Sequence, residues 1–283
     1  MAKEPTTLQI ELMFSKLNGA RASDSFPPPA TLSRILNGIV DKATSDSAPI
    51  SQIEITNFAT AAVEMWHRAI HSFLISASLT KASPIWSSVS GYYSSHYSIR
   101  GFAHLLGYFQ LNKKKRNIQL EINGTPYLCH IKPKGGNEEH KFYWMKVHEH
   151  PFFITNSFFP ENNEYNVISD SAHRNKANYF DHLNGFPPFQ VLDEIYLKQR
   201  VSVISKIEID DAPIPNSESD PYPDIENVQI MAYHRMVKFR EFIDNILGGS
   251  NRFWNVHRKP SWCPNFLNFQ LVKPESAKEK IGG

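Results

Sequence analysis

The stretch Ser87–Phe109 reads SSVSGYYSSHYSIRGFAHLLGYF and is the most informative segment of the chain. At about 100° per residue it predicts a helix with two unlike faces. The apolar face comprises Ile99, Phe102, Ala103, Leu106 and Phe109. The opposite face carries Tyr93, His96, Tyr97, Arg100 and His104. An ordinary amphipathic helix has Lys and Glu there. Tyrosine, histidine and arginine can instead stack on bases, exchange protons and bind phosphate, so this face either binds RNA or a nucleotide or packs on another helix.

Helical spacing of apolar residues predicts two further long helices. Ile55–Leu79, with Thr56 as a possible N-cap, precedes the central helix. Because only the break at Lys81–Pro84 separates the two, we expect an antiparallel helix pair. Ile225–Leu247 is the last long helix, and Gly248-Gly249 ends it. Arg235 falls inside its apolar stripe and therefore needs a partner, because an unpaired buried charge is costly.

The pattern changes to that of short strands after the central helix. Lys113–Arg116 is a basic corner, usually solvated, with a phosphate contact as the minority reading. Asn117–Ile122 and Thr125–Ile131 flank Asn123-Gly124, a hairpin signal. His140–Val147 fits a third strand. The sequence thus predicts a mainly α (α+β) fold with an antiparallel β-meander inserted at about 116–150.

The ends of the chain are predicted with less regular structure. Leu8–Leu17 is amphipathic, and a second short helix follows Thr31. Residues 45–49 fit a loop by composition. We expect residues 1–50 to form a helical extension, residues 51–250 the main helical domain, and residues 251–283 an aromatic and basic tail without a helix pattern.

Composition limits the class of protein. The chain has 283 residues, of which 41% are hydrophobic and 20% charged, as is typical of a globular protein. The formal net charge is only +2, so any nucleic-acid surface must be a local patch. Two cysteines exclude a disulfide framework. No signal peptide or apolar run of roughly 20 residues is visible, and we expect a cytoplasmic protein with no membrane contact.

Two patterns together resemble a known family. Tyr92–Gly107 reads Tyr-Tyr-x-x-x-Tyr-x-x-Arg-x-x-x-x-Leu-Leu-Gly, and a later segment from Arg174 reads Arg-x-Lys-Ala-Asn-Tyr. Over about residues 54–110 and 167–248 the chain resembles the HEPN superfamily. These are helical domains of prokaryotic toxin, antiviral defence and CRISPR-associated proteins, and many are metal-independent ribonucleases that act as dimers.

The resemblance implies roles for particular residues. Arg174 and Asn175 match the start of the family's catalytic pattern, and the first histidine after them is His182, at a longer spacing than usual. Arg174 would hold the phosphate, and His182 or His96 would take the proton of a ribose 2′-hydroxyl. The substrate-binding residues would be Arg100, Asn175, Tyr179, Tyr93, Tyr97 and His104. The same resemblance implies a homodimer, with no cofactor.

Two other readings stay open. A non-catalytic module would use the same faces to bind a partner subunit of a defence complex. A metalloenzyme would use Glu64, His67 and His71, which share one helix face, or His148-Glu149-His150. Neither histidine group has an identifiable full ligand set, so we expect no bound metal.

Overall fold

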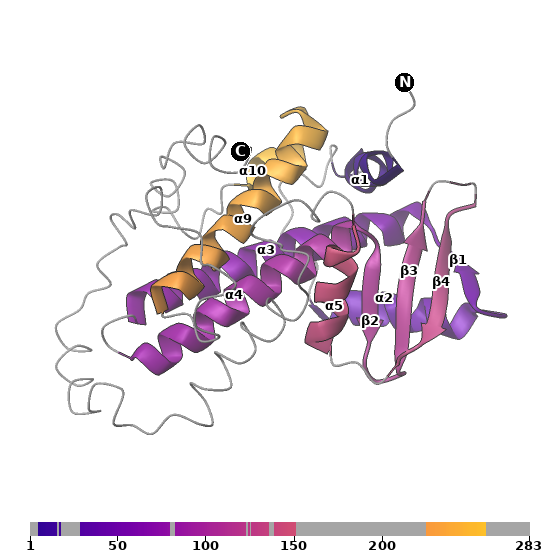
Figure 1. Ribbon diagram of the computed structural model, residues 1–283. Coiled ribbons are helices and arrows are strands. Elements are labelled where there is room, and N and C mark those ends of the chain that lie inside the picture. The colour runs from indigo at the N-terminus through magenta and orange to yellow at the C-terminus, as the bar shows by residue number, and fades with distance from the viewer. Residues whose placement is uncertain are drawn as a thin grey trace. The chain divides into compact units, whose positions relative to one another are not determined.

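The computed structural model describes residues 5–15, 17, 29–79, 83–122, 124, 126–135, 139–150 and 225–258. Its helices are α1 (Pro5–Ser15), α2 (Pro29–Lys42), α3 (Gln52–Leu79), α4 (Pro84–Leu105), α5 (Glu139–His148), α9 (Ile225–Leu247) and α10 (Arg252–His257) (Figure 1). Helices account for 70% of the described residues. The mainly α fold with a small antiparallel sheet is therefore confirmed. None of the described helices is long and apolar enough to cross a membrane.

Four antiparallel strands form the sheet in the order β1-β4-β3-β2. They are β1 (Ser47–Pro49), β2 (Tyr108–Leu111), β3 (Arg116–Glu121) and β4 (Leu128–Pro133). Apolar side chains alternate along the strands, so one face of the sheet is buried; its members include Phe109, Ile118, Leu120, Cys129 and Ile131. Helix α2 contacts β1 and β2, and its Leu36 and Ile39 are buried.

The sheet differs from the predicted meander in three places. His140–Val147 is not a strand, because it lies in α5, where buried Tyr143, Trp144 and Val147 recur at helical spacing. Residues 47–49, expected in a loop, form an edge strand instead. The hairpin is confirmed, but pairing of β3 with β4 ends at Glu121 and Leu128, so the connection is longer than a two-residue turn. The other two strands of the sheet, β1 and β2, come from segments that precede the predicted insertion.

Helices α3 and α4 form the expected antiparallel pair. Ser76 and Ser87 exchange hydrogen bonds from each hydroxyl to the other's carbonyl, at 2.7 and 2.6 Å. Two helical turns further along the pair, the Ser94 hydroxyl donates a hydrogen bond to the Ala69 carbonyl at 2.8 Å. Serines at these contacts let the two backbones approach closely while their hydroxyl groups stay hydrogen-bonded.

Helix α4 ends earlier than the sequence pattern suggests. Gly107 adopts a positive φ of 84°, and a Cβ there would lie 2.9 Å from the Cβ of Leu120. The chain therefore leaves the helix after Leu105, and Phe109 enters β2 rather than the last helical turn. The end of α9 follows the prediction, since Gly248 and Gly249 both have positive φ.

The chain divides into two compact units, and the boundaries after residues 66, 98, 147 and 237 fall inside helices. Unit 1 comprises residues 1–66, 99–147 and 238–260, and thus holds the sheet, α1, α2, α5 and α10. Unit 2 comprises residues 67–98, 148–237 and 261–283. The predicted domain limits follow sequence position and stay a prediction. Helix α10 was not expected in the C-terminal tail; its Phe253 and Trp254 are buried, and Asn251 caps it.

The start of α3 provides a test of local stability. Ser51, rather than Thr56, lies at the N-terminus, where its hydroxyl and the Glu54 carboxylate form a reciprocal capping box. Thr56 donates to the Gln52 carbonyl inside the helix. We expect Ser51→Ala to lower the free energy of unfolding by about 1 kcal/mol in urea denaturation. The control Ser33→Ala, inside α2, is expected to leave it nearly unchanged; equal losses in both variants would contradict the cap.

Candidate functional site

A dense group of cations lies at one end of the sheet in unit 1. The turn after β2 carries Lys113, Lys114 and Lys115, and β3 begins at Arg116. Strand register places Lys132 opposite Asn117, and the Lys134 amide donates to the Lys115 carbonyl at 2.8 Å. The β2–β3 turn and the end of β4 therefore bring six cations together, which we call the basic end: Lys113, Lys114, Lys115, Arg116, Lys132 and Lys134.

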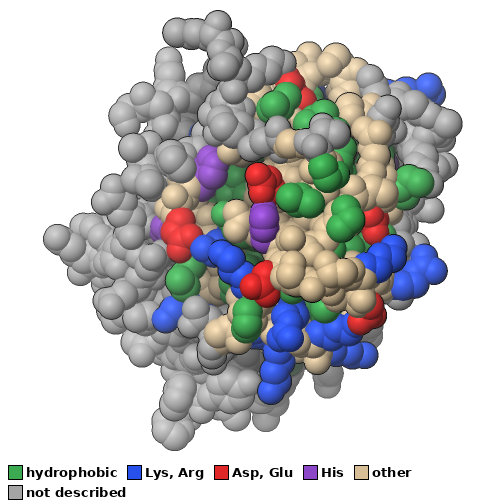
Figure 2. All heavy atoms as spheres, turned by 90° about the vertical axis from the view of Figure 1, so that its right-hand side faces the viewer, with side chains coloured by type: hydrophobic (Ala, Val, Ile, Leu, Met, Phe, Trp, Pro, Cys, Tyr) green, Lys and Arg blue, Asp and Glu red, His purple; other side chains and the backbone are tan. Residues whose placement is uncertain are grey.

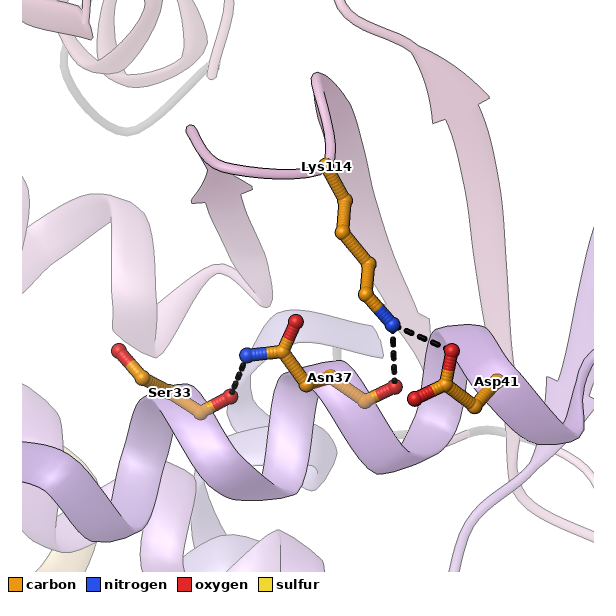
Figure 3. A network of polar contacts seen from close by, with 4 residues as sticks. All are labelled: Ser33, Asn37, Asp41 and Lys114. Atoms are coloured by element: carbon orange, nitrogen blue, oxygen red, sulfur yellow. Dashed lines mark hydrogen bonds and ion pairs between the residues drawn. The ribbon is translucent and has the colours of Figure 1, made fainter.

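Little negative charge offsets the basic end. Lys114 forms an ion pair with Asp41 of α2 and also donates to the Asn37 carbonyl at 3.4 Å (Figure 3). Lys134 donates to the Asn112 side chain at 2.7 Å. No carboxylate of the described residues forms an ion pair with Lys113, Lys115, Arg116 or Lys132. Figure 2 shows several Lys and Arg side chains on this side of the molecule, with Asp and Glu side chains among them.

The turn itself is held in an uncommon conformation. Lys115 has a φ of 50°, in the left-handed region where glycine or asparagine is usual. Lys113 and Lys115 are exposed, and Lys132 is exposed at the end of β4. The fold thus presents these three ammonium groups to solvent, where their mutual repulsion favours an anionic ligand.

The face of the sheet opposite its apolar side is polar and adjoins the basic end. Alternation puts Asn117, Gln119 and Glu121 of β3 on this face, with His130 and Lys132 of β4. Tyr108 and Gln110 of β2 complete it. The Gln110 amide donates to Asn117 Oδ1 at 3.0 Å, and His130 Nε2 lies 2.5 Å from Glu121 Oε2. Most of these groups are only half-buried, so they are accessible to a ligand.

The predicted binding face of α4 is divided between the two units. Tyr93, His96 and Tyr97 belong to unit 2, whereas Arg100 and His104 belong to unit 1. Tyr93 and Tyr97 are half-buried, with ring centroids 6.0 Å apart. His96 is 4% exposed and stacks on Tyr92 with centroids 6.3 Å apart. The roles predicted for these three residues stay predictions, and packing accounts for part of the face.

His104 is fully buried in unit 1. Its ring stacks on Phe109 with centroids 4.5 Å apart and meets the edge of Tyr143. Burial, followed by the charge of Arg100, holds the pKa of His104 well below 6.5; the backbone near Ala61 offsets this only partly. Neither ring nitrogen reaches hydrogen-bond geometry with a described residue. This neutral ring is part of the core, and its contact with substrate stays a prediction.

Arg100 is half-buried and lies beside the same aromatic group. Its guanidinium carbon is 5.2 Å from the centroid of the Tyr143 ring, a cation–π contact. The Tyr143 hydroxyl in turn accepts a hydrogen bond from the Gln110 backbone amide at 3.2 Å. Arg100 is thus tied to α5 and β2, which accounts for its position without a ligand. A phosphate contact by Arg100 stays a prediction.

Unit 2 brings a histidine and an arginine together that the sequence did not connect. Burial, and then the charge of Arg235, lowers the pKa of His148 from 6.5 to about 4. His148 is therefore neutral at pH 7 beside a guanidinium. Both side chains are buried, with Arg235 at 0% exposure, so the pair is closed to solvent. The predicted burial of Arg235 in the apolar stripe of α9 is confirmed.

This leaves the predicted residues of the segment after residue 170, the possible metal ligands and the buried cysteine. Arg174, Asn175, Tyr179 and His182 lie outside the described residues. No group of three or more potential metal ligands occurs in the described part of the chain. Burial and the charge of Glu54 raise the pKa of the Cys129 thiol to about 12, which makes it a poor nucleophile at neutral pH.

Sequence reasoning identified four of the six cations of the basic end and missed Lys132 and Lys134. Lys113–Arg116 is visible as a charge run, but Lys132 and Lys134 lie 16 or more positions further along. The alternation of β4 indicates that Lys132 and His130 share a face. Only the register shows that this face continues into the basic turn.

Comparison of the chain with family models, with curated proteins and with solved structures finds no match.

Proposed function

We propose that the protein binds RNA through the basic end of its sheet. The observation that carries the proposal is the cluster of six cations with a single acidic partner, Asp41, among the described residues. When clustered Lys and Arg side chains contact the phosphates of a nucleic acid, they release the counterions condensed on it, which favours binding. The chain as a whole has a net charge of only +2, so the cluster is a local feature. A local basic patch on a nearly neutral protein suits a nucleic-acid contact.

The proposal extends to metal-independent RNA cleavage in a toxin or antiviral defence setting. Its support is the sequence resemblance to the HEPN superfamily and the residues Arg174 and His182 that match it. An arginine would stabilise charge on the phosphate while a neutral histidine takes the 2′-hydroxyl proton. A homodimer is the assembly that the resemblance implies. Cleavage in the presence of a chelator that is lost in both Arg174→Ala and His182→Ala would support the extension.

The binding proposal is tested by removing three cations whose side chains form no ion pair or hydrogen bond with a described residue. The variant Lys113→Gln/Lys115→Gln/Lys132→Gln keeps the Lys114–Asp41 ion pair. We expect RNA affinity to fall by about 100-fold in fluorescence anisotropy, at roughly 1 kcal/mol per phosphate contact. The slope of log affinity against log salt should fall by about two, since each contact contributes about 0.7.

A charge-matched control separates the cluster from net charge. Arg34, Lys42 and Lys141 are exposed cations outside the basic end. The variant Arg34→Gln/Lys42→Gln/Lys141→Gln is expected to bind RNA within about threefold of the unsubstituted protein, because it leaves the clustered phosphate contacts in place. Equal losses in the two triple variants would contradict the proposal. Absence of RNA binding by the unsubstituted protein would favour the alternative, a module that binds a partner subunit.

A further inference from the structure

The polar face of the sheet forms rows that begin at the basic end. Register places Gln110, Asn117 and Lys132 side by side across β2, β3 and β4. The next row, two residues further along β3, holds Tyr108, Gln119 and His130. Neighbouring strands lie roughly 4.8 Å apart, so each row spans about 10 Å. A ligand whose phosphates contact the basic end would place its adjoining groups over these rows.

The side chains in the rows carry both hydrogen-bond donors and acceptors. Asn117 accepts a hydrogen bond from Gln110 through Oδ1, and its own N–H2 group donates to no described residue. Gln119 Nε2 approaches the Tyr108 hydroxyl at 3.4 Å, and Gln119 Oε1 accepts no hydrogen bond from a described residue. Two residues apart on one strand, β3 therefore offers an outward donor and an outward acceptor. The edges of unpaired nucleobases present the same two kinds of group.

Cations lie on two sides of these rows. Lys132 stands opposite Asn117 at the basic end. On the other side, Lys146 of α5 places its Nζ 5.4 Å from the centroid of the Tyr108 ring. Among the strand residues that the structure describes on this face, Glu121 is the one acidic residue; it lies at the far end of β3, where its Oε2 is 2.5 Å from His130 Nε2. Phosphates on either side of a stretch of bases would therefore meet positive charge.

The chemistry favours nucleic acid over a membrane surface. The large apolar side chains that are exposed among the described residues are Leu8, Ile53, Ile75, Trp86 and Val256, and none lies in the sheet. A membrane-binding patch needs such side chains next to its cations. It also favours a single strand, because duplex RNA hides its base edges and offers mainly phosphates and 2′-hydroxyls.

We propose that the polar face of β2, β3 and β4 binds the bases of single-stranded RNA while the basic end holds the adjoining phosphates. This inference rests on the proposed function and adds a substrate class and a base-contacting surface to it. Asn117 and Gln119 contact the base edges, and Lys132 contacts the backbone.

The test compares a 12-nucleotide single-stranded RNA with the duplex of the same sequence by fluorescence anisotropy. The unsubstituted protein should bind the single strand about tenfold more tightly. Asn117→Ala/Gln119→Ala, which leaves every cation in place, should lose this preference while the salt slope stays the same. The control Asn57→Ala/Asn255→Ala removes two amides outside the sheet and should keep the preference.

The outcomes distinguish this inference from the proposed function. If the unsubstituted protein binds single strand and duplex with equal affinity, base contact by the sheet is overturned. If the lysine triple variant then loses binding to both RNAs, RNA binding by the basic end still stands. A single-strand preference that persists in Asn117→Ala/Gln119→Ala would also overturn it. If neither RNA binds the unsubstituted protein, the proposed function itself is overturned.

Discussion

Gly101→Ala is expected to destabilise the protein by about 2 kcal/mol, although alanine favours helices more than glycine does. A Cβ at position 101 would lie 2.9 Å from the Phe239 ring and 3.2 Å from the Ala62 carbonyl oxygen. The ring cannot move aside easily, because it stacks on Trp66 with centroids 5.8 Å apart and meets Phe102 at 5.1 Å. Overpacking against a ring held on two sides costs about 3 kcal/mol, and the roughly 1 kcal/mol gained in helix propensity leaves a net loss of about 2 kcal/mol.

Gly38 provides the matched control inside another helix. A Cβ there would meet no atom within 4 Å. Gly38→Ala should therefore stabilise the protein by about 0.5–1 kcal/mol, since only helix propensity changes. Urea denaturation of both variants measures the difference. A Gly101→Ala protein as stable as the unsubstituted one would show that α3, α4 and α9 do not pack as closely as the structure places them.

Acidification is expected to destabilise the fold by about 3 kcal/mol between pH 7 and pH 5. His104 and His148 both have native pKa values below that of an unfolded histidine, for His148 about 4. Below pH 6.5 the unfolded chain therefore binds protons that the native state does not, and stability falls as the pH falls. Protonation of one unfolded histidine over this range limits its contribution to about 2 kcal/mol, and we expect the fully buried His104 to contribute more of the loss than His148.

The variant His104→Phe isolates the larger contribution. Phenylalanine retains the stacking on Phe109 and removes two buried nitrogens, so stability at pH 7 should be unchanged or slightly higher. The loss between pH 7 and pH 5, from urea denaturation at both values, should shrink to about 1 kcal/mol. His71→Asn, at an exposed histidine on α3, should keep the full loss. An unchanged loss in His104→Phe would exclude His104 as its source.

The local sequence predicts a structural feature correctly where that feature depends on a single helix or turn. The apolar spacing of Ile225–Leu247 and the glycines after it predict the bounds of α9, because helix periodicity and left-handed C-caps are local properties. The short break before Pro84 likewise predicts the antiparallel pair of α3 and α4. The strand predicted at His140–Val147 is wrong, because a short apolar run fits the period of a helix as well as that of a strand. Packing against neighbouring elements decides between the two.

Which chemical groups are buried, and which lie close together, depends on tertiary packing. His104 and Arg100 share a helix face with Tyr97 in the sequence, but packing against Phe109 and Tyr143 removes His104 from solvent. The basic run Lys113–Arg116, the mainly α content and the hairpin that follows can all be predicted from neighbouring residues. Strand register then placed Lys132 and Lys134 beside that turn, because pairing between β3 and β4 is a non-local contact that no run of neighbouring residues encodes.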